Sequence, residues 1–371
     1  MREQAEGLTP WRESPRTERV WLTGLLLANL WMGLGSAWDF HWHEAVGRDS
    51  FWIPPHMLLY SGALIAMGLV FLIALRTSAA VRSLHPLTVL RALHARGYGV
   101  VGIGGATMAG AAIFDEFWHR TIGDLTIWSP PHVLGVIGGV LIGLGTIIAL
   151  LNAIRRRIVT PGWGRAGVLG LVSGVLISAY FGLVPGAVMA FLPQGVGYRF
   201  FTTNNPYFVA VIASITIPVI VTGSRHVLGK RGFELAVTVG VGLWCIQEAF
   251  HPIATPLVAE TFGYTVVHPY RAFNLRFDLL VLGFMVLPPV LANRANAIHP
   301  SVTGALIGIL YIGEVAIWLG VAGVERSLSI FAVVAMIAAG ALSARFGAWA
   351  GRRIRRTSAV GLIPSPSLPL A

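Results

Sequence analysis

The chain has 371 residues, of which 55% are hydrophobic and 12% charged, with 27 Lys and Arg against 16 Asp and Glu. Soluble domains carry about 25% charged residues, so this composition, with a mean hydropathy of +0.71, excludes a soluble globular protein. The single cysteine, Cys245, excludes a disulfide framework and a cysteine-based zinc site within one chain.

The apolar runs predict an all-α, polytopic membrane protein, because about ten of them approach the roughly 20 residues that a helix needs to cross a bilayer. In chain order they are Val20–Asp39, Pro55–Leu75, Tyr98–Trp118, His132–Ile154, Gly167–Ala190, Tyr207–Thr222, Glu234–Phe250, Asp278–Ala292, Thr303–Val321 and Leu328–Phe346. No small-residue cleavage site follows the first run, so we expect a retained anchor and not a signal peptide. The predicted organisation is an N-terminal segment (1–19), a four-helix region (20–154), a six-helix region (155–350) and a tail (351–371).

Basic residues are distributed very unequally between alternate loops. The termini and the loops on their side contain 21 Lys and Arg, whereas the other loops contain 6. The positive-inside rule therefore places both termini in the cytoplasm, in a protein of the cell (inner) membrane whose first partner is the lipid bilayer. Topology and anionic lipid explain the arginine clusters at 155–157 and 352–356, and no nucleic-acid-binding module is present.

Two segments of the chain match at an offset of 76 residues, one at 38–56 and one at 114–132. The identical positions are Asp39/Asp115, Trp42/Trp118, His43/His119, Gly47/Gly123, Trp52/Trp128 and the triplets Pro54-Pro55-His56 and Pro130-Pro131-His132. Each copy contains the end of one predicted helix and the start of the next. The two copies therefore have the same orientation in the membrane, with their polar residues on the non-cytoplasmic side.

The repeated residues form a pattern of possible metal ligands. The i, i+4 spacing places Asp39 and His43 on one face of a helix. Proline in a first turn loses no intrahelical hydrogen bond, so the next helix starts there and holds His56 at a similar depth. One carboxylate and two imidazoles suit copper, zinc, non-haem iron or nickel and leave a fourth position for water, oxygen or substrate. The second copy offers the same set, Asp115, His119 and His132.

A single motif of this kind would be explained by a helix cap or an interfacial anchor. Ionisable residues in a membrane are costly and usually functional, and two copies with identical internal spacing favour metal binding. A possible third site consists of Glu248, His251 and His268 on the same side, although it lacks the Pro-Pro-His element. Its alternative is a satisfied polar cluster. His41 faces away from His43 on a helix and fits the ligand pattern poorly.

The first copy resembles the C subunit of the particulate methane and ammonia monooxygenases. The resemblance is carried by Asp39-x2-Trp42-His43, Val46, Arg48-Asp49-Ser50 and Pro54-x-His56, because the family has a copper site of the form Asp-x3-His-x12-His within such a stretch. The second copy is similar to the second copper site of that subunit. There the family has Asn at the position of Asp115 and a slightly longer gap to the last histidine. The resemblance covers about residues 38–132, and the present chain continues well beyond the length of that subunit.

The resemblance implies a copper-binding membrane protein, either a catalytic monooxygenase (oxidoreductase) subunit or a diverged relative. It further implies oxidation of a small apolar substrate that arrives from the bilayer, and partner subunits of the monooxygenase type. Zinc, iron or haem are alternative cofactors.

Two other functions stay open. A copper-handling protein for transport, storage or insertion would account for the additional helices. However, Cu(I) transporters favour Met or Cys clusters, and here eight Met are dispersed. A b-type haem electron carrier would use paired histidines, but haem needs no carboxylate ligand.

The difference between 21 and 6 basic residues predicts that both termini are cytoplasmic. A reporter that is active only outside the cytoplasm should therefore be silent when fused after Ala371. The same reporter inserted after Gly123, in a loop of the opposite set, should be active. Activity of the C-terminal fusion would contradict the topology and move every predicted site to the other face.

Overall fold

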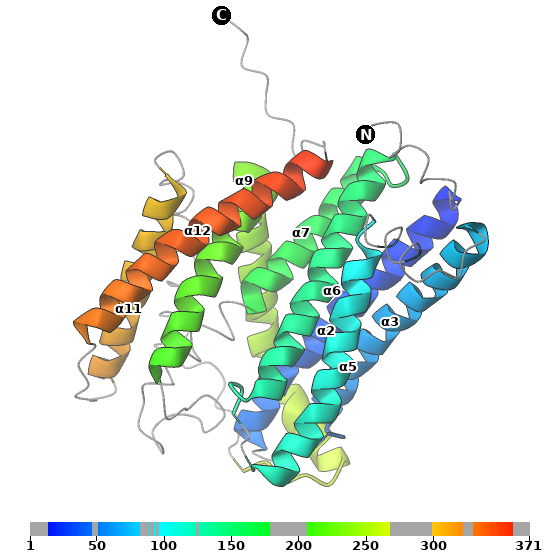
Figure 1. Ribbon diagram of the computed structural model, residues 1–371. Helices are drawn as coiled ribbons and strands as arrows, with labels where there is room; N and C mark the ends of the chain where they lie inside the picture. The colour runs from blue at the N-terminus through cyan, green and yellow to red at the C-terminus, as the bar shows by residue number, and fades with distance from the viewer. Residues whose placement is uncertain are drawn as a thin grey trace, which may run out of the picture. The chain divides into compact units, whose positions relative to one another are not determined.

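The computed structural model describes residues 14–46, 51–81, 89, 93, 96–123, 126–178, 206–267, 299–321 and 329–358. Within these ranges every regular element is an α-helix (Figure 1), which confirms the predicted all-α class. The helices are α2 (Pro15–Ala45), α3 (Pro54–Val81), α5 (Tyr98–Thr121), α6 (Pro130–Arg155), α7 (Pro161–Ser178), α9 (Pro206–Thr261), α11 (Pro300–Val321) and α12 (Ile330–Ser358).

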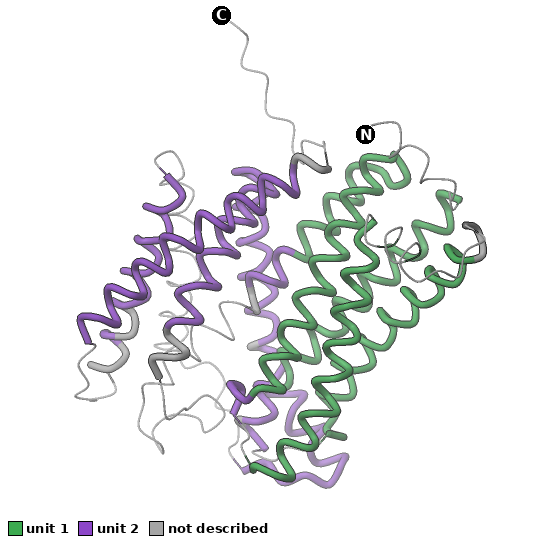
Figure 2. Tube along the Cα trace, viewed as in Figure 1, with its two compact units in different colours: residues 1–39, 50–124, 130–171 green, residues 40–49, 125–129, 172–371 purple. Residues whose placement is uncertain are grey.

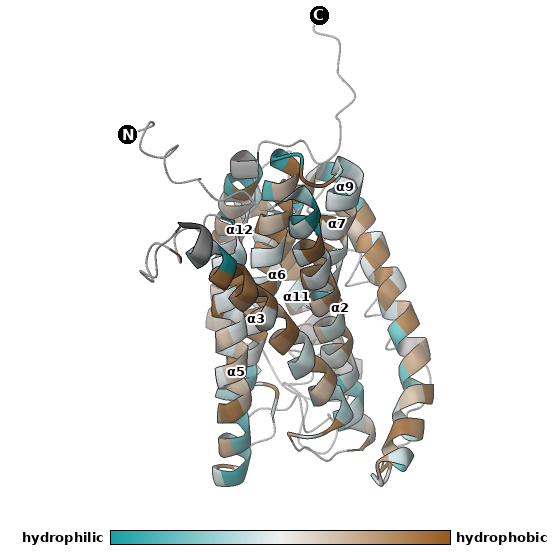
Figure 3. Ribbon diagram, turned by 90° about the vertical axis from the view of Figure 1, so that its right-hand side faces the viewer, coloured by the Kyte–Doolittle hydropathy of each residue, from teal (hydrophilic) through white to brown (hydrophobic). Residues whose placement is uncertain are grey.

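Six of the described helices are long and apolar enough to cross a bilayer. The spanning segments are Pro15–His43, Pro54–Ser78, Tyr98–Thr121, Pro130–Arg155, Val211–Thr261 and Ile330–Arg355. Large apolar side chains on these helices are exposed, among them Ile113 (75%) and Phe331 (84%), as expected of surfaces that face lipid. Figure 3 shows apolar residues through the middle of α3 and α5 and hydrophilic residues at the lower end of α5. The chain is therefore a multi-pass membrane protein.

Helix α9 contains two of the predicted spans, Tyr207–Thr222 and Glu234–Phe250. Between them Gly229 has φ 75° and ψ 178°, a backbone conformation almost restricted to glycine. A straight helix over the 51 residues of this span would be about 75 Å long, more than twice the hydrocarbon thickness of about 30 Å. We infer that α9 comprises two helical segments joined at Gly229.

The other predicted spans correspond to the described helices to different extents. The first four coincide with α2, α3, α5 and α6, and the last two with α11 and α12. The predicted span at 167–190 is described only as far as Ser178, within α7, and the predicted span at 278–292 lies outside the described residues. The total of ten spans therefore stays a prediction, as does a domain boundary at residue 155.

The first of two compact units consists of residues 1–39, 50–124 and 130–171 (Figure 2). In this unit α3 packs on α5 and α5 packs on α6. Glycines lie where the helices cross: a methyl group on Gly104 would lie 2.7 Å from the carbonyl oxygen of Gly138, and one on Gly35 would lie 2.5 Å from the backbone nitrogen of Leu59. Such small residues let helix backbones approach closely, which is how membrane helices gain packing energy without a hydrophobic driving force between them.

The second compact unit consists of residues 40–49, 125–129 and 172–371. Here α12 packs on both α9 and α11. Close glycine contacts recur, because a methyl group on Gly347 would lie 2.5 Å from the carbonyl oxygen of Val219, and Gly304 lies directly against Gly340. Helix α2 is continuous, and its last residues, from Phe40 to Ala45, belong to this unit.

A buried ion pair joins three elements of the first unit. The Glu18 carboxylate, near the start of α2, is buried and accepts hydrogen bonds from both terminal nitrogens of Arg156, which follows α6. The hydroxyl of Tyr98, at the start of α5, donates to the same carboxylate at 3.4 Å. Further along α2, the Asn29 amide donates to the Thr146 hydroxyl of α6 at 3.1 Å. These contacts set the register of α2 against α6.

Loss of Arg156 should destabilise this bundle. Arg156→Gln would leave the buried Glu18 carboxylate without its cation, a change expected to cost about 2–3 kcal/mol. Thermal unfolding of the detergent-solubilised protein should show a lower midpoint. The double variant Glu18→Gln/Arg156→Gln should lose less than the sum of the two single variants, because neither then leaves a charge unpaired. Additive losses would show that the pair contributes no coupling energy.

Candidate metal centres

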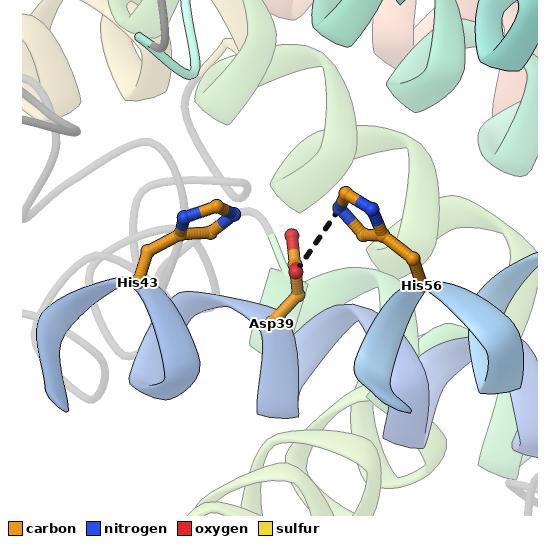
Figure 4. A group of neighbouring side chains, drawn as sticks. All are labelled: Asp39, His43 and His56. Atoms are coloured by element: carbon orange, nitrogen blue, oxygen red, sulfur yellow. Dashed lines mark ion pairs between the residues drawn. The ribbon is translucent and has the colours of Figure 1, made fainter. Parts of the chain in front are cut away.

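The first candidate centre consists of Asp39 and His43, in the last two turns of α2, and His56 in the first turn of α3. One possible ligand atom from each of the three side chains lies within 4.8 Å of the others. Figure 4 shows the Asp39 carboxylate between the two imidazole rings, with all three side chains on the same side of their helices. The Oδ1 atom of Asp39 lies 3.2 Å from Nε2 of His56. The sequence-predicted residues of the first copy are thus brought together.

The second candidate centre has the same composition. Asp115 and His119 lie near the end of α5 and His132 lies in the first turn of α6, again with ligand atoms within 4.8 Å of one another. The Oδ1 atom of Asp115 lies 3.2 Å from Nε2 of His119 and 3.3 Å from Nε2 of His132. The two imidazole rings are tilted by 53° with centroids 5.4 Å apart. The second predicted trio is therefore also brought together.

Local sequence explains why both trios form. Helices α2 and α5 end six residues after their Asp, and helices α3 and α6 both begin at the first proline of a Pro-Pro-His triplet. Proline at a helix start lacks only an N–H group that has no intrahelical acceptor. The corresponding helix ends and helix starts are 76 residues apart, the same offset as the sequence match. A helix end, a short loop and a proline-initiated helix therefore place the ligands alike in both copies.

The separations between ligand atoms fit a bound metal ion. Two ligands held at about 2.0–2.1 Å from one ion in a tetrahedral arrangement lie about 3.3–3.4 Å apart. The carboxylate–imidazole distances of 3.2–3.3 Å are close to this value. They are longer than the roughly 2.7–2.9 Å of a charge-assisted hydrogen bond. A set of two nitrogens and one oxygen is accepted by Cu²⁺ and Zn²⁺ and leaves room for a further ligand.

Electrostatics also favour a cation at both centres. Asp39 and Asp115 are largely shielded from solvent, and the neutral form of a contacting imidazole cannot cancel the carboxylate charge. In addition, the C-terminal ends of α2 and α5 carry the negative pole of the helix dipole. A divalent ion would compensate both the carboxylate charge and the negative pole of the helix.

The third site stays a prediction, because most of it lies outside the described residues. His251 is buried on α9, but the Glu248 side chain and the whole of His268 lie outside the described residues. The His251 ring instead stacks on the ring of His41, with centroids 4.1 Å apart and an angle of 26° between the planes. Among the described residues, only the two Asp-His-His trios bring three such ligands together. Sequence patterns did not predict the His41–His251 pair, since no periodicity links residues so distant in the chain.

An aromatic layer covers the first centre. The ring of Tyr60, one turn after His56, lies 5.4 Å from the His56 ring, and Phe51 stacks on Tyr60 at 5.2 Å. Position 136, the counterpart of Tyr60 at the 76-residue offset, is an exposed valine. The two centres therefore share ligands but differ in their surroundings.

Comparison of the chain with protein-family models, with curated proteins and with solved structures finds no match. Function must therefore be argued from the two centres themselves.

Proposed function

We propose that this protein is a copper-binding integral membrane protein related to the C subunit of the copper membrane monooxygenases. The observation that carries the proposal is the carboxylate oxygen held 3.2–3.3 Å from imidazole nitrogens in two separate Asp-His-His trios. Copper is preferred to zinc, iron or nickel because Cu²⁺ has the highest affinity of the divalent first-row ions for a site of given nitrogen and oxygen ligands. The motif resemblance over residues 38–132 points to the same metal.

In this proposal the ligands have distinct tasks. The imidazoles of His43 and His56, or of His119 and His132, hold the ion, while the aspartate cancels one unit of its charge. Bound copper supplies one-electron redox chemistry and oxygen activation. The fourth position, which no protein ligand of the trio fills, is where oxygen or substrate would approach.

The surroundings of the second centre suit a small apolar substrate. Phe117 and Ile122, on either side of His119 in the sequence, are exposed apolar residues on a membrane-spanning helix or at its end. Val136, one turn after His132, is also exposed. A small hydrocarbon dissolved in the bilayer would meet these apolar side chains near the centre, next to the ion pair of the exposed Arg120 with Glu116. These apolar residues support a monooxygenase subunit or a diverged relative. In this proposal it acts with partner subunits of the monooxygenase type.

Copper handling is the second candidate function. It is favoured by the helices beyond α6, which the family subunit does not have. It is disfavoured by the ligand chemistry, since carboxylate and imidazole ligands suit Cu(II), whereas transported Cu(I) is usually held by thiolate and thioether ligands.

Haem binding by these histidines fits poorly. The Oδ1 atom of Asp115 lies within 3.3 Å of Nε2 in both His119 and His132. A porphyrin held between these two imidazoles would have to occupy the position of the carboxylate. The geometry of the trio therefore favours a bare metal ion.

Purified protein from copper-replete membranes should contain up to two equivalents of copper. His43→Ala and His119→Ala should each remove about one equivalent, because the loss of one of three protein ligands leaves too few to hold the ion. Elemental analysis of the variants measures this directly, and the His299→Ala variant, altered in an exposed histidine outside both trios, is the control. Unchanged copper in the double variant His43→Ala/His119→Ala, or haem absorbance bands, would refute the metal assignment.

Asp115→Asn should retain copper but raise the reduction potential of the second centre. An anionic ligand stabilises the more highly charged Cu(II) state, and this effect is stronger at low dielectric. Asp39→Asn should act in the same way on the first centre, whereas Ala at either position should weaken binding itself. A redox titration followed by the Cu(II) electron paramagnetic resonance (EPR) signal measures the shift. Equal potentials for the wild type and Asp115→Asn would mean that Asp115 orients His119 and does not bind the metal.

A further inference from the structure

The helix ends that carry the two centres are covered to very different degrees. At the end of α2 the residues His41, Trp42, Ala45 and Val46 are all buried, and Trp42 has no exposed surface. Two of the corresponding positions, one on α5 and one just beyond it, are exposed. Phe117, the counterpart of His41, is 60% exposed, and Ile122, the counterpart of Val46, is 58% exposed. Side chains beside the ligands are thus buried in the first copy and exposed at these two positions of the second, while the ligands themselves are largely shielded in both.

The last turns of α9 and the residues that follow it make three of the contacts at the end of α2. The His251 ring stacks on His41 at 4.1 Å, and the Tyr264 ring meets the Trp42 ring edge-on at 5.2 Å. The backbone N–H of Val267 donates to the carbonyl oxygen of Ala45 at 2.9 Å. All of these residues belong to the second compact unit.

These contacts act on the part of a helix that is otherwise least stable. The last four carbonyl groups of a helix have no intrahelical donor, and the final turn frays unless other groups hold it. The bond from Val267 satisfies one of these carbonyl groups, and the two ring contacts fix the two side chains that directly precede His43. Because Asp39 and His43 are one helical turn apart, their relative position depends on this turn remaining helical.

The His41–His251 pair has the geometry of stacking and not of chelation. Two imidazoles that bind one ion are splayed, as the His119 and His132 rings are, at 53° and 5.4 Å. The His41 and His251 rings are nearly parallel at 26° and 4.1 Å. His251 is only 3% exposed, and neither of its ring nitrogens hydrogen-bonds to a residue that the structure describes. What its ring contributes here is therefore a flat surface against His41.

We propose that the last turns of α9 and the residues just after them position the first metal centre through the end of α2, with His251 as the main positioning residue. This inference rests on the proposed function in so far as the trios bind copper. It assigns a role to helix α9 and the segment after it, which have no counterpart in the motif resemblance.

The test uses two single-centre backgrounds of the full chain. His119→Ala retains only the first centre, and His43→Ala retains only the second. Adding His251→Ala to the first background should weaken Cu(II) binding about tenfold or more, the usual effect of removing a group that orients a ligand, and should alter the copper hyperfine splitting in the EPR spectrum. Adding it to the second background should change neither quantity.

A conservative variant distinguishes positioning from the alternatives. His251→Phe keeps a flat ring against His41 and removes both nitrogens, so it should restore the affinity and spectrum of the first centre. If His251→Ala lowered the Cu(II) affinity equally in both backgrounds, the proposal would be overturned, because the variant would then destabilise the whole protein. If His251→Phe lowered the Cu(II) affinity of the first centre as much as His251→Ala, the proposal would also be overturned, because His251 would then act as a metal ligand. Absence of copper from both single-centre backgrounds before any change at His251 would instead refute the proposed function.

Discussion

A carboxylate enclosed near the apolar part of a membrane must have partners, and in this protein those partners are imidazoles from the same helix and from the start of the next one. The Oδ1 atoms of Asp39 and Asp115 lie 3.2–3.3 Å from Nε2 atoms of the neighbouring histidines. Neutral imidazoles do not compensate a buried negative charge, whereas a divalent ion does. A divalent ion bound as proposed would compensate this charge at the ends of both apolar helix pairs.

The depth of the two centres depends on contacts at the other end of the same helices. Glu18, Arg156 and Tyr98 tie together the starts of α2 and α5 and the residue after α6. Glycine contacts between α5 and α6 then allow close packing along their length. Since an α-helix is rigid and rises 1.5 Å per residue, fixing one end fixes the level at which ligands at the other end meet. The fold therefore separates a structural ion pair from the candidate copper centres by the length of a membrane-spanning helix.

Two centres with identical ligands need not do the same chemistry. The first is backed by Tyr60 and by residues from α9 and beyond, and its helix end is buried. The second is flanked by exposed apolar residues of α5 and α6. A ligand set that is rigidly held favours tight, geometrically constant binding, while an open coordination position beside an apolar surface favours access of a bilayer-dissolved molecule. Under the proposal that both trios bind copper, the contacts at the end of α2 predict the more constant ligand geometry at the first centre.

The sequence alone determined what depends on local geometry. The i, i+4 spacing of Asp39 and His43 on a helix and the proline start that places His56 predicted a trio that the structure assembles, and the same reasoning held for the second copy. Apolar content and run length determined the all-α class for the same reason, since the hydrogen bonds of a helix are all within the segment. Tertiary structure decided the rest. It placed Gly229 at the junction of two predicted spans in α9, and it paired His251 with His41 across most of the chain. Such contacts follow from how separate helices pack, and no repeat or spacing in the sequence encodes which distant residue will meet another.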